Sequence, residues 1–273
     1  MDKESKIISY FSHALNGDDG AVCGQFVYSK DLFIENVHFK RTWLSMKEIG
    51  SKAVLVNISD AIAMNATPLF ALLGLALPKS LKDDEIKELC EAIKNECVSF
   101  GVSIIGGDTT SADKIIISLT IISKVNGKAL LRTGAKNGDF VAFTGVLGGS
   151  NKGLKALQNG AKLAKNSRFV RPSLRREFVF EAANFLRCGM DISDGLLNDL
   201  PKLIKGKGVE FSTKLSKQIW QSGEEYEMLV CIKKSHLQRV LNIAKKTRTK
   251  ITILGKVKNG SLKLPKHRAF KHF

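Results

Sequence analysis

Residues 57–68 read N-I-S-D-A-I-A-M-N-A-T-P, and the chain around them organises the first half of the molecule. Apolar residues recur here at spacings of three, four and seven, which is the period of one helix face. The pattern predicts a helix from Met46 to Ala66, and Pro68 is expected to stop it because proline lacks the backbone N–H that a helix needs. The apolar positions with this period are Ile49, Ala53, Val56 and Ala63.

Asp60 stands out within this largely apolar helix. Aspartate is a poor helix former, and a buried carboxylate is costly unless it is paired. We therefore expect Asp60 either to cap a local structure or to bind a cation.

Strands and helices alternate on both sides of this helix. Two short apolar segments within residues 26–39 predict strands that end at a corner around His38. Residues 69–77 form an almost unbroken apolar run, which is typical of a buried strand. The next expected elements are a helix from its N-cap Ser80 to Gly101, a strand over residues 102–105 that exits at Gly106-Gly107-Asp108, and a strand over residues 115–123.

A second alternation begins after residue 124. After a strand at residues 140–144, a glycine-rich turn leads into a helix. The spacing of its glycines matches neither the Walker loop nor the dinucleotide fingerprint. We therefore expect a two-domain α/β protein, with domains at residues 1–124 and 125–273. Its later elements are a helix that follows Arg171-Pro172 and runs through Leu186, a strand over residues 189–192 and a helix over residues 196–204.

Composition indicates a globular protein of a reducing compartment. The 273 residues are enough to bury a core, and the five cysteines form no Cys-x-x-Cys pair. No apolar run approaches the roughly 18 residues that span a bilayer, and no secretory signal is recognisable. We expect a cytoplasmic protein with no membrane partner.

The net charge of +17 is divided unevenly along the chain. Residues 1–123 hold 12 Lys/Arg and 16 Asp/Glu, a charge of −4, whereas residues 124–273 hold 31 and 10, a charge of +21. The basic half is compatible with a lysine-rich surface, attraction of phosphorylated substrates, or nucleic-acid binding. The lysines are not interleaved with aromatic residues, so the pattern does not favour RNA as a partner.

Three short acidic motifs sit far apart: Asp18-Asp19-Gly20, Gly107-Asp108 and Asp191-Ile192-Ser193-Asp194. Each places carboxylates where the backbone can approach a ligand closely, and carboxylate oxygens are ligands that Mg²⁺ accepts beside phosphate. Taken singly, each motif has a structural alternative: a solvated turn, a strand exit and a helix cap. His38 is likewise compatible with a structural hydrogen bond, and Arg132 with a surface cation.

Hydrolytic chemistry has no motif in the chain. Neither a Gly-x-Ser-x-Gly elbow nor a His-Glu-x-x-His zinc motif is present. The acidic motifs therefore favour magnesium-assisted phosphoryl transfer over zinc or triad hydrolysis.

The ordered set of motifs resembles the thiamine-monophosphate kinase family over essentially the whole chain. This family belongs to the superfamily of aminoimidazole ribonucleotide synthetase and selenophosphate synthetase. The motifs are Asp18-Asp19-Gly20-Ala21, Asp31 through His38-Phe39, residues 57–68, Gly106-Gly107-Asp108-Thr109, residues 131–139, Asp191–Leu196 and Gly223–Glu227.

The resemblance implies a fold, an assembly and a reaction. The fold is the two-domain α/β (α+β) architecture of that superfamily, in which the N-terminal sheet forms a homodimer interface. The reaction is direct transfer of phosphate from ATP, a co-substrate, to thiamine monophosphate with several Mg²⁺ ions. The alternative within the superfamily is a synthetase that phosphorylates an amide or carbonyl oxygen.

The resemblance also implies roles for individual residues. Asp108, Asp194 and Arg132 would be catalytic, and Asp18 would assist from behind the metal ligands. His38, Glu225 and Phe270 would contact the substrate, with Phe270 stacking on the thiamine rings unless it is only a hydrophobic anchor of the tail. ATP would be bound by Gly107, Asp108, Arg132 and Ser193, and Mg²⁺ by Asp19, Ser29, Asp31, Asp60, Asp108, Asp191 and Asp194.

Several positions depart from the family pattern. The stretch between Gly208 and Gly223 is shorter than the family norm. These differences bear on acceptor geometry more than on ATP binding, and Lys30 is hypothesised to supply a fixed charge in place of one metal contact. Lys30 and Leu32 replace threonines, Glu225 replaces the aspartate of Gly-Glu-Asp-Tyr-Glu-Leu, and Ala269 replaces a glycine.

Overall fold

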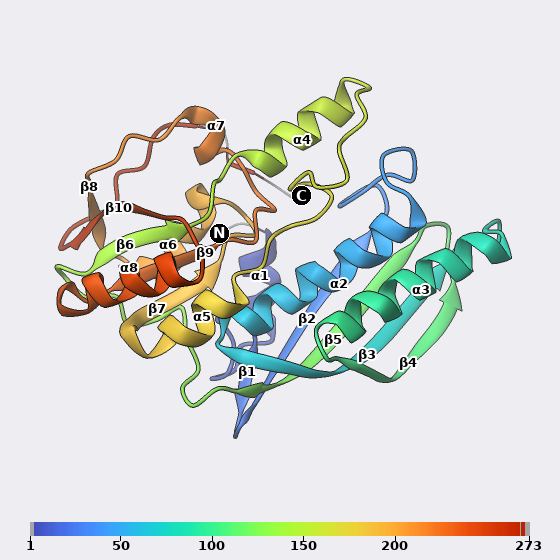
Figure 1. Ribbon diagram of the computed structural model, residues 1–273, viewed down its shortest axis with the longest axis horizontal. Coiled ribbons are helices and arrows are strands. Elements are labelled where there is room, and N and C mark those ends of the chain that lie inside the picture. Colours follow the sequence, from blue (N-terminus) through green and yellow to red (C-terminus); the bar gives the residue numbers. More distant parts are fainter. Residues whose placement is uncertain (1–2, 268, 271–273) are drawn as a thin grey trace.

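The computed structural model describes residues 3–267, 269 and 270, and it contains two five-stranded sheets flanked by helices (Figure 1). The first sheet is built from residues 21–125 and the second from residues 140–258. The last residues of the expected C-terminal domain, 271–273, lie outside the described part of the chain.

The first sheet has the strand order β1-β2-β5-β3-β4. Only the β3–β4 pair is parallel, and the helix α3 makes the crossover between these two strands. A short helix, α1 (Lys3–Tyr10), precedes the sheet. The strands are β1 (Ala21–Cys23), β2 (Phe26–Ile34), β3 (Ala66–Leu77), β4 (Ser103–Ser111) and β5 (Ile116–Val125).

Two helices, α2 (Met46–Ala63) and α3 (Asp83–Ser99), cover one face of this sheet (Figure 1). A capping box starts α2: the Ser45 hydroxyl accepts from the Glu48 N–H, and the Glu48 carboxylate accepts from the Ser45 N–H. Most of α2 is buried because it is packed between the sheet, α3 and the second domain. Helix α2 is therefore the central element of the molecule.

The end of α2 differs from the expectation. The helix ends at Ala63 rather than Ala66, because Asn65 adopts a left-handed backbone with φ of 57° and turns the chain into β3. Pro68 does not stop the helix; it lies within β3, where the strand pairing shifts between Pro68 and Phe70. A proline is tolerated at such an irregularity because a ladder hydrogen bond is already missing there.

Other boundaries are confirmed or displaced by a few residues. Helix α3 ends before Gly101 as predicted, but its N-cap is Lys82 rather than Ser80, and the Lys82 N–H donates to Glu85 Oε2 at 3.0 Å. The apolar segments within residues 26–39 form one long strand and a turn instead of two strands. Gly106-Gly107-Asp108 lies inside β4 and not at a strand exit.

The face of the first sheet opposite α2 and α3 leaves several large apolar side chains exposed. Residues 69–77 form a strand as predicted, but the strand is not fully buried: Phe70 is 40% and Leu72 is 41% exposed. On β2, Tyr28 and Leu32 point the same way. We call this surface the open face and define it by Tyr28, Leu32, Phe70 and Leu72.

The second sheet has the order β7-β9-β6-β10-β8 and is antiparallel throughout. Helices α5 and α8 pack on the side that meets α2, and α6 packs on the opposite side. The strands are β6 (Phe140–Thr144), β7 (Leu186–Asp191), β8 (Gly208–Phe211), β9 (Met228–Ile232) and β10 (Ile251–Lys258). The α-helices are α4 (Gly149–Gln158), α5 (Arg176–Ala182), α6 (Leu196–Ile204), α7 (Lys217–Trp220) and α8 (Leu237–Lys246).

Two elements of this domain are confirmed at their predicted bounds: the strand at residues 140–144 and the helix at residues 196–204. The helix expected after Arg171-Pro172 and through Leu186 is shorter. It starts at Arg176, tightens into a 3-10 turn at Ala183–Phe185, and gives way to β7 at Leu186. Among the described residues, no helix combines the length and apolar character needed to cross a bilayer.

Candidate active site

Two cavities meet near the turn that follows β2. The larger, of about 580 Å³, is lined by the loop before β1, by β2, by the last turns of α2 and by the turn after β7. The smaller, of about 300 Å³, is lined by the turn at residues 36–43, by α4, by Gly223 and Glu224, and by Phe270. His38 lines both cavities, so it stands where they adjoin.

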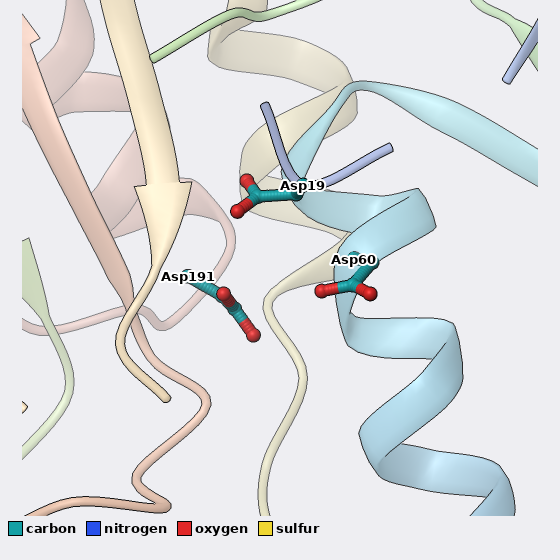
Figure 2. A group of neighbouring side chains, drawn as sticks. All are labelled: Asp19, Asp60 and Asp191. Atoms are coloured by element: carbon teal, nitrogen blue, oxygen red, sulfur yellow. The ribbon is translucent and has the colours of Figure 1, made fainter. Parts of the chain in front are cut away.

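Three carboxylates converge at the larger cavity. Asp19 comes from the loop before β1, Asp60 from the last turn of α2, and Asp191 from the end of β7. One oxygen of each lies within 4.8 Å of the others, and Figure 2 shows the three side chains facing a common point. Residues that are far apart in the sequence therefore form one acidic cluster.

Strand β2 adds two more polar side chains beside this cluster. Ser29 and Asp31 both line the cavity, and they share a strand face because side chains two residues apart point the same way. The Asp31 N–H donates to Asn57 Oδ1 at 2.9 Å, and the Asn57 amide donates to the Ala53 carbonyl at 2.8 Å. Helix α2 thus fixes the position of β2 next to Asp60.

Burial of like charges raises the pKa values of these carboxylates. Burial is the main cause for Asp19, whose pKa is about 7, and for Asp31, whose pKa is also about 7 and is raised further by Asp191 and Asp194. Burial raises the pKa of Asp60 well above its usual value, and Asp31 and Asp191 add to the effect. Such a cluster is costly in its ionised form unless a cation neutralises it.

The donor atoms fit a hard divalent cation. Asp19 Oδ2, Asp191 Oδ1 and Ser29 Oγ are buried without a hydrogen-bond partner, although buried polar atoms are nearly always paired. Carboxylate and hydroxyl oxygens are the ligands that Mg²⁺ takes in proteins, with phosphate and water at its remaining positions. The cluster is therefore a candidate magnesium site.

Asp18 and Asp19 hold Arg132 against this cluster. Its backbone N–H donates to Asp18 Oδ1 at 2.7 Å, and its guanidinium donates to Asp19 Oδ1 through Nε at 2.8 Å and also through Nη2. Asp18 thus contacts the arginine backbone and lines the same cavity. The guanidinium lines the cavity, where it can meet an anion.

The turn after β7 brings Ser193 and Asp194 to the same cavity. Lys202 Nζ lies 2.6 Å from Asp194 Oδ2 and 3.3 Å from Asp199 Oδ1. Burial raises the pKa of Asp199 well above its usual value, while Lys202 opposes that shift. A second fixed cation therefore stands at the rim of the acidic cluster.

Asp108 and Gly107 are not brought to this cavity within one chain. Asp108 pairs with Gly74, Gly74 with Ser118, and Ser118 with Leu32, so Asp108 is three strand spacings from β2, roughly 14 Å away. The pairing also puts Asp108 on the side of the open face, whereas Asp31 points to the covered face. A side chain at Gly107 is excluded, since its Cβ would lie 1.8 Å from the Leu73 carbonyl oxygen.

The smaller cavity gathers His38, Phe270 and Glu224. His38 Nδ1 accepts from the Ile34 N–H at 3.0 Å, which sets the plane of the ring. The Phe270 ring packs against Gly223, where a Cβ would lie 2.5 Å from the ring, and the Phe270 carbonyl accepts from Asn198 Nδ2 at 3.0 Å. The described part of the C-terminal tail thus returns to this cavity.

Glu225, predicted to contact the substrate, points elsewhere. It is 2% exposed, and its carboxylate accepts from the N–H groups of Gly148 at 2.8 Å and Ser150 at 3.2 Å and from the Ser222 hydroxyl. It therefore closes the N-terminus of α4, and the glycine-rich turn binds a side chain of its own domain. The glutamate at the cavity is its neighbour, Glu224.

Three polar residues at the site were missed by the sequence interpretation. Ser59 Oγ donates to Asp191 Oδ2 at 2.7 Å, Lys202 pairs with Asp194, and Lys52 pairs with Glu224. Ser59 precedes Asp60 directly, and that adjacency was an available signal. Lys202 is one of many lysines in a basic half, so nothing in the sequence separates it from a surface residue.

Comparison with known proteins gives two adjoining family matches. Residues 17–125 match the N-terminal domain of AIR synthase related proteins, and residues 136–265 match the C-terminal domain of the same family. The solved structure described as AaThiL complexed with AMPPCP and TMP superposes with a TM-score of 0.87 at 26% identity, covering 99% of this chain and 96% of that one. The two-domain fold expected from the sequence is confirmed.

Two relatives of similar sequence are both named thiamine-monophosphate kinase. Thiamine-monophosphate kinase of Buchnera aphidicola is 32% identical over 272 residues, covering 88% of this chain and 83% of the relative. Thiamine-monophosphate kinase of Bacillus subtilis is 35% identical over 209 residues, and the match covers 71% of this chain but 64% of the longer relative. The chain belongs to the thiamine-monophosphate kinase family, within the AIR synthase related proteins.

Proposed function

We propose that this chain transfers the terminal phosphoryl group of ATP directly to the phosphate of thiamine monophosphate, giving thiamine diphosphate and ADP. The observation that carries the proposal is the convergence of buried carboxylates in one cavity that adjoins a second through His38. The larger cavity suits a polyphosphate with its cations, and the smaller one suits an acceptor. A relative of the same fold was solved with AMPPCP, an ATP analogue, and TMP.

Several Mg²⁺ ions are the expected cofactors. Asp19, Ser29, Asp31, Asp60, Asp191 and Asp194 would hold them, and these residues meet at the larger cavity. Bound there, Mg²⁺ would neutralise charge on the phosphate oxygens. The raised pKa values of Asp19 and Asp31 support this role, because Arg132 alone does not offset the burial of these carboxylates and a divalent cation would.

Protein groups around the cluster would orient the nucleotide. Arg132 is fixed in place by Asp18 and Asp19, so its guanidinium needs little reorganisation to bind a phosphate oxygen. Ser193 lies in a turn directly before helix α6, where backbone N–H groups favour anions. Apolar side chains of Ile7, Ile8 and Phe11 form one wall of the same cavity and suit the base.

Three side chains of the smaller cavity would bind the acceptor. Phe270 offers a ring face to the cationic thiazolium, which is attracted to the negative side of an aromatic ring. Glu224 would add a carboxylate near the same cation. It would thus take the substrate contact that the sequence assigned to Glu225. His38 lies between the cavities and would hold the accepting phosphate beside the nucleotide.

A homodimer would complete the site. The open face exposes large apolar side chains in a contiguous set of strands, which is typical of a protein interface. If two open faces meet, Asp108 and Gly107 of one protomer can reach the nucleotide of its partner. In this arrangement residues 1–124 supply most metal ligands and the dimer surface, and residues 125–273 supply phosphate and acceptor contacts.

The reaction is assigned to the cytoplasm. All five cysteines are free, including the neighbouring Cys188 and Cys231 on β7 and β9, which is usual in a reducing compartment.

The Lys30 ammonium donates to Ser118 Oγ at 2.7 Å, so its hypothesised contact with phosphate requires it to leave this hydrogen bond.

A direct assay tests the function. Purified protein is incubated with ATP, Mg²⁺ and thiamine monophosphate, and the products are separated by chromatography. We expect thiamine diphosphate and ADP in equal amounts and no product when EDTA replaces Mg²⁺. Bound ATP without thiamine diphosphate would instead favour a synthetase of the same superfamily, and the kinase assignment would be abandoned.

A further inference from the structure

Lys52 is buried at the centre of the molecule. It lies in the middle of α2 and is 1% exposed, among residues that are otherwise largely apolar. Lysine is almost never fully buried unless its ammonium is paired, because the charge is costly to remove from water. A fully buried lysine on the helix that also carries Asp60 therefore needs an explanation.

The Lys52 ammonium is enclosed by one carboxylate and two aromatic rings. Nζ lies 2.8 Å from Glu224 Oε2, 3.9 Å from the centre of the Phe169 ring and 5.7 Å from the centre of the Phe33 ring. The rings contribute negative faces that favour a cation. Since Lys52 and Phe33 come from the first domain and Glu224 and Phe169 from the second, this contact joins the two domains.

Glu224 sits in a turn whose backbone is unusual. Glu224 has φ of 51° and Tyr226 has φ of 53°, a left-handed conformation that non-glycine residues rarely adopt. The Glu224 N–H donates to the Ser193 carbonyl at 2.7 Å, so the turn is tied to the residue before Asp194. A strained turn of this kind persists only when its surroundings hold it, and the Lys52 ion pair is one such contact.

Helix α2 connects this turn to the acidic cluster. Lys52, Val56 and Asp60 follow one another at four-residue intervals and therefore lie along one helix face. Eight residues of helix span roughly 12 Å. The Lys52 end of this face reaches Glu224 at the smaller cavity, and the Asp60 end reaches Asp19 and Asp191 at the larger cavity.

We propose that Lys52 is a positioning residue for the acceptor. It fixes the Glu224 carboxylate at the smaller cavity, at a set distance from the acidic cluster. The carboxylate then holds the cationic ring of the acceptor while the acceptor's phosphate faces the nucleotide. This inference rests on the proposed kinase function and deepens it. Lys52 itself does not touch either substrate.

The test compares kinetic constants for the two substrates. In Lys52→Met, which keeps the length and apolar body of the side chain, we expect the KM for thiamine monophosphate to rise at least about tenfold and the KM for ATP to stay within about twofold. Glu224→Gln should show the same split. The double variant should be no worse than the more affected single one, because both changes remove one contact.

Two further variants separate positioning from general stability. Lys52→Arg keeps the charge and should recover part of the acceptor affinity, whereas Lys47→Met removes an exposed lysine of the same helix and should change neither KM. Circular dichroism and ATP binding report whether each variant is folded. If Lys52→Met does not fold, the Glu224→Gln result decides alone.

The outcomes distinguish this inference from the function on which it rests. A wild-type protein that forms no thiamine diphosphate overturns the kinase proposal. A wild-type protein that is active, with an unchanged acceptor KM in folded Lys52→Met or, failing that, in Glu224→Gln, overturns the role of Lys52 alone. An equal rise in both KM values also overturns it, because a loosened fold would affect the two substrates alike.

Discussion

The two faces of the first sheet use the same strands for different purposes. On β2, Ser29 and Asp31 point to the covered face and join the acidic cluster, whereas Tyr28 and Leu32 point to the open face. The covered face is closed by α2 and holds charges that need cations. The open face presents apolar side chains, and in the proposed dimer a second copy would cover them. Neighbouring residues of one strand thus alternate between the acidic cluster and an exposed apolar surface.

The pleat of a strand, rather than a motif, decides which carboxylates meet. Asp31 and Asp108 belong to equally acidic-looking motifs, but they lie on opposite sides of one sheet. If both serve the same reaction, the open face must bring Asp108 to the site of a second copy.

The largest expected effect comes from one carboxylate of each face. Asp60→Asn on the covered side and Asp108→Asn on the open side should each lower turnover at least about 100-fold, because each removes a charge that stabilises the transferred phosphoryl group. Mixed and allowed to exchange subunits, the two inactive proteins should recover about a quarter of wild-type turnover, since half of the dimers would then contain one intact site.

This complementation is specific to a site shared between protomers. Mixing Asp60→Asn with Asp191→Asn is the matched control, because both side chains belong to the same chain's cluster and no intact site can form. Recovery in the control, or none with Asp108→Asn, would show that Asp108 does not act across the open face.

The next effect concerns assembly. Leu72→Glu places a charge in the middle of the open face, and burying that carboxylate in a dimer would be costly. We expect sedimentation to show a dissociation constant raised at least about 100-fold, with turnover falling at low protein concentration. Val98→Glu is the control, because Val98 is 64% exposed on α3 and away from the open face. A monomeric wild-type protein would contradict the dimer outright.

The smallest effect is on the pH dependence of stability. The raised pKa values of about 7 for Asp19 and Asp31 mean that the folded protein holds protons that the unfolded chain releases near pH 4. Their contribution to the free energy of unfolding is therefore present below pH 4 and is lost as pH rises to about 7. Without Mg²⁺, the unfolding temperature should fall by several degrees between pH 5 and pH 8.

Magnesium should remove most of this dependence, because it replaces the protons. Calorimetry with and without Mg²⁺ measures the difference, and Asp31→Asn should flatten the slope of the metal-free protein. A slope that is the same in Asp31→Asn would show that other groups dominate the titration.

Much of the covered side was predictable from the sequence. Asp60 was recognised because an aspartate in an apolar helix conflicts with its surroundings, and the structure places it beside Asp19 and Asp191. The strand at residues 140–144 and the helix at residues 196–204 were predictable because apolar pattern and turn residues agree there.

The remainder depended on geometry that one sequence does not contain. Whether Glu224 or Glu225 faces the smaller cavity follows from the left-handed backbone of Glu224, which no residue type at that position requires. The face on which Asp108 lies follows from strand register, and a shift of one residue would reverse it. The helix end predicted from Pro68 is in the wrong place, because an irregular strand tolerates proline as well as the end of a helix does.

The carboxylate of Glu225 has one more consequence. It occupies the amides of Gly148 and Ser150 at the start of α4, a position that would otherwise attract phosphate. In the proposed reaction, a triphosphate would therefore find this helix end occupied by an internal anion and would bind at the acidic cluster instead. A helix end blocked in this way would leave the proposed enzyme dependent on its cations for holding the nucleotide, and would favour ATP bound to Mg²⁺ over free ATP.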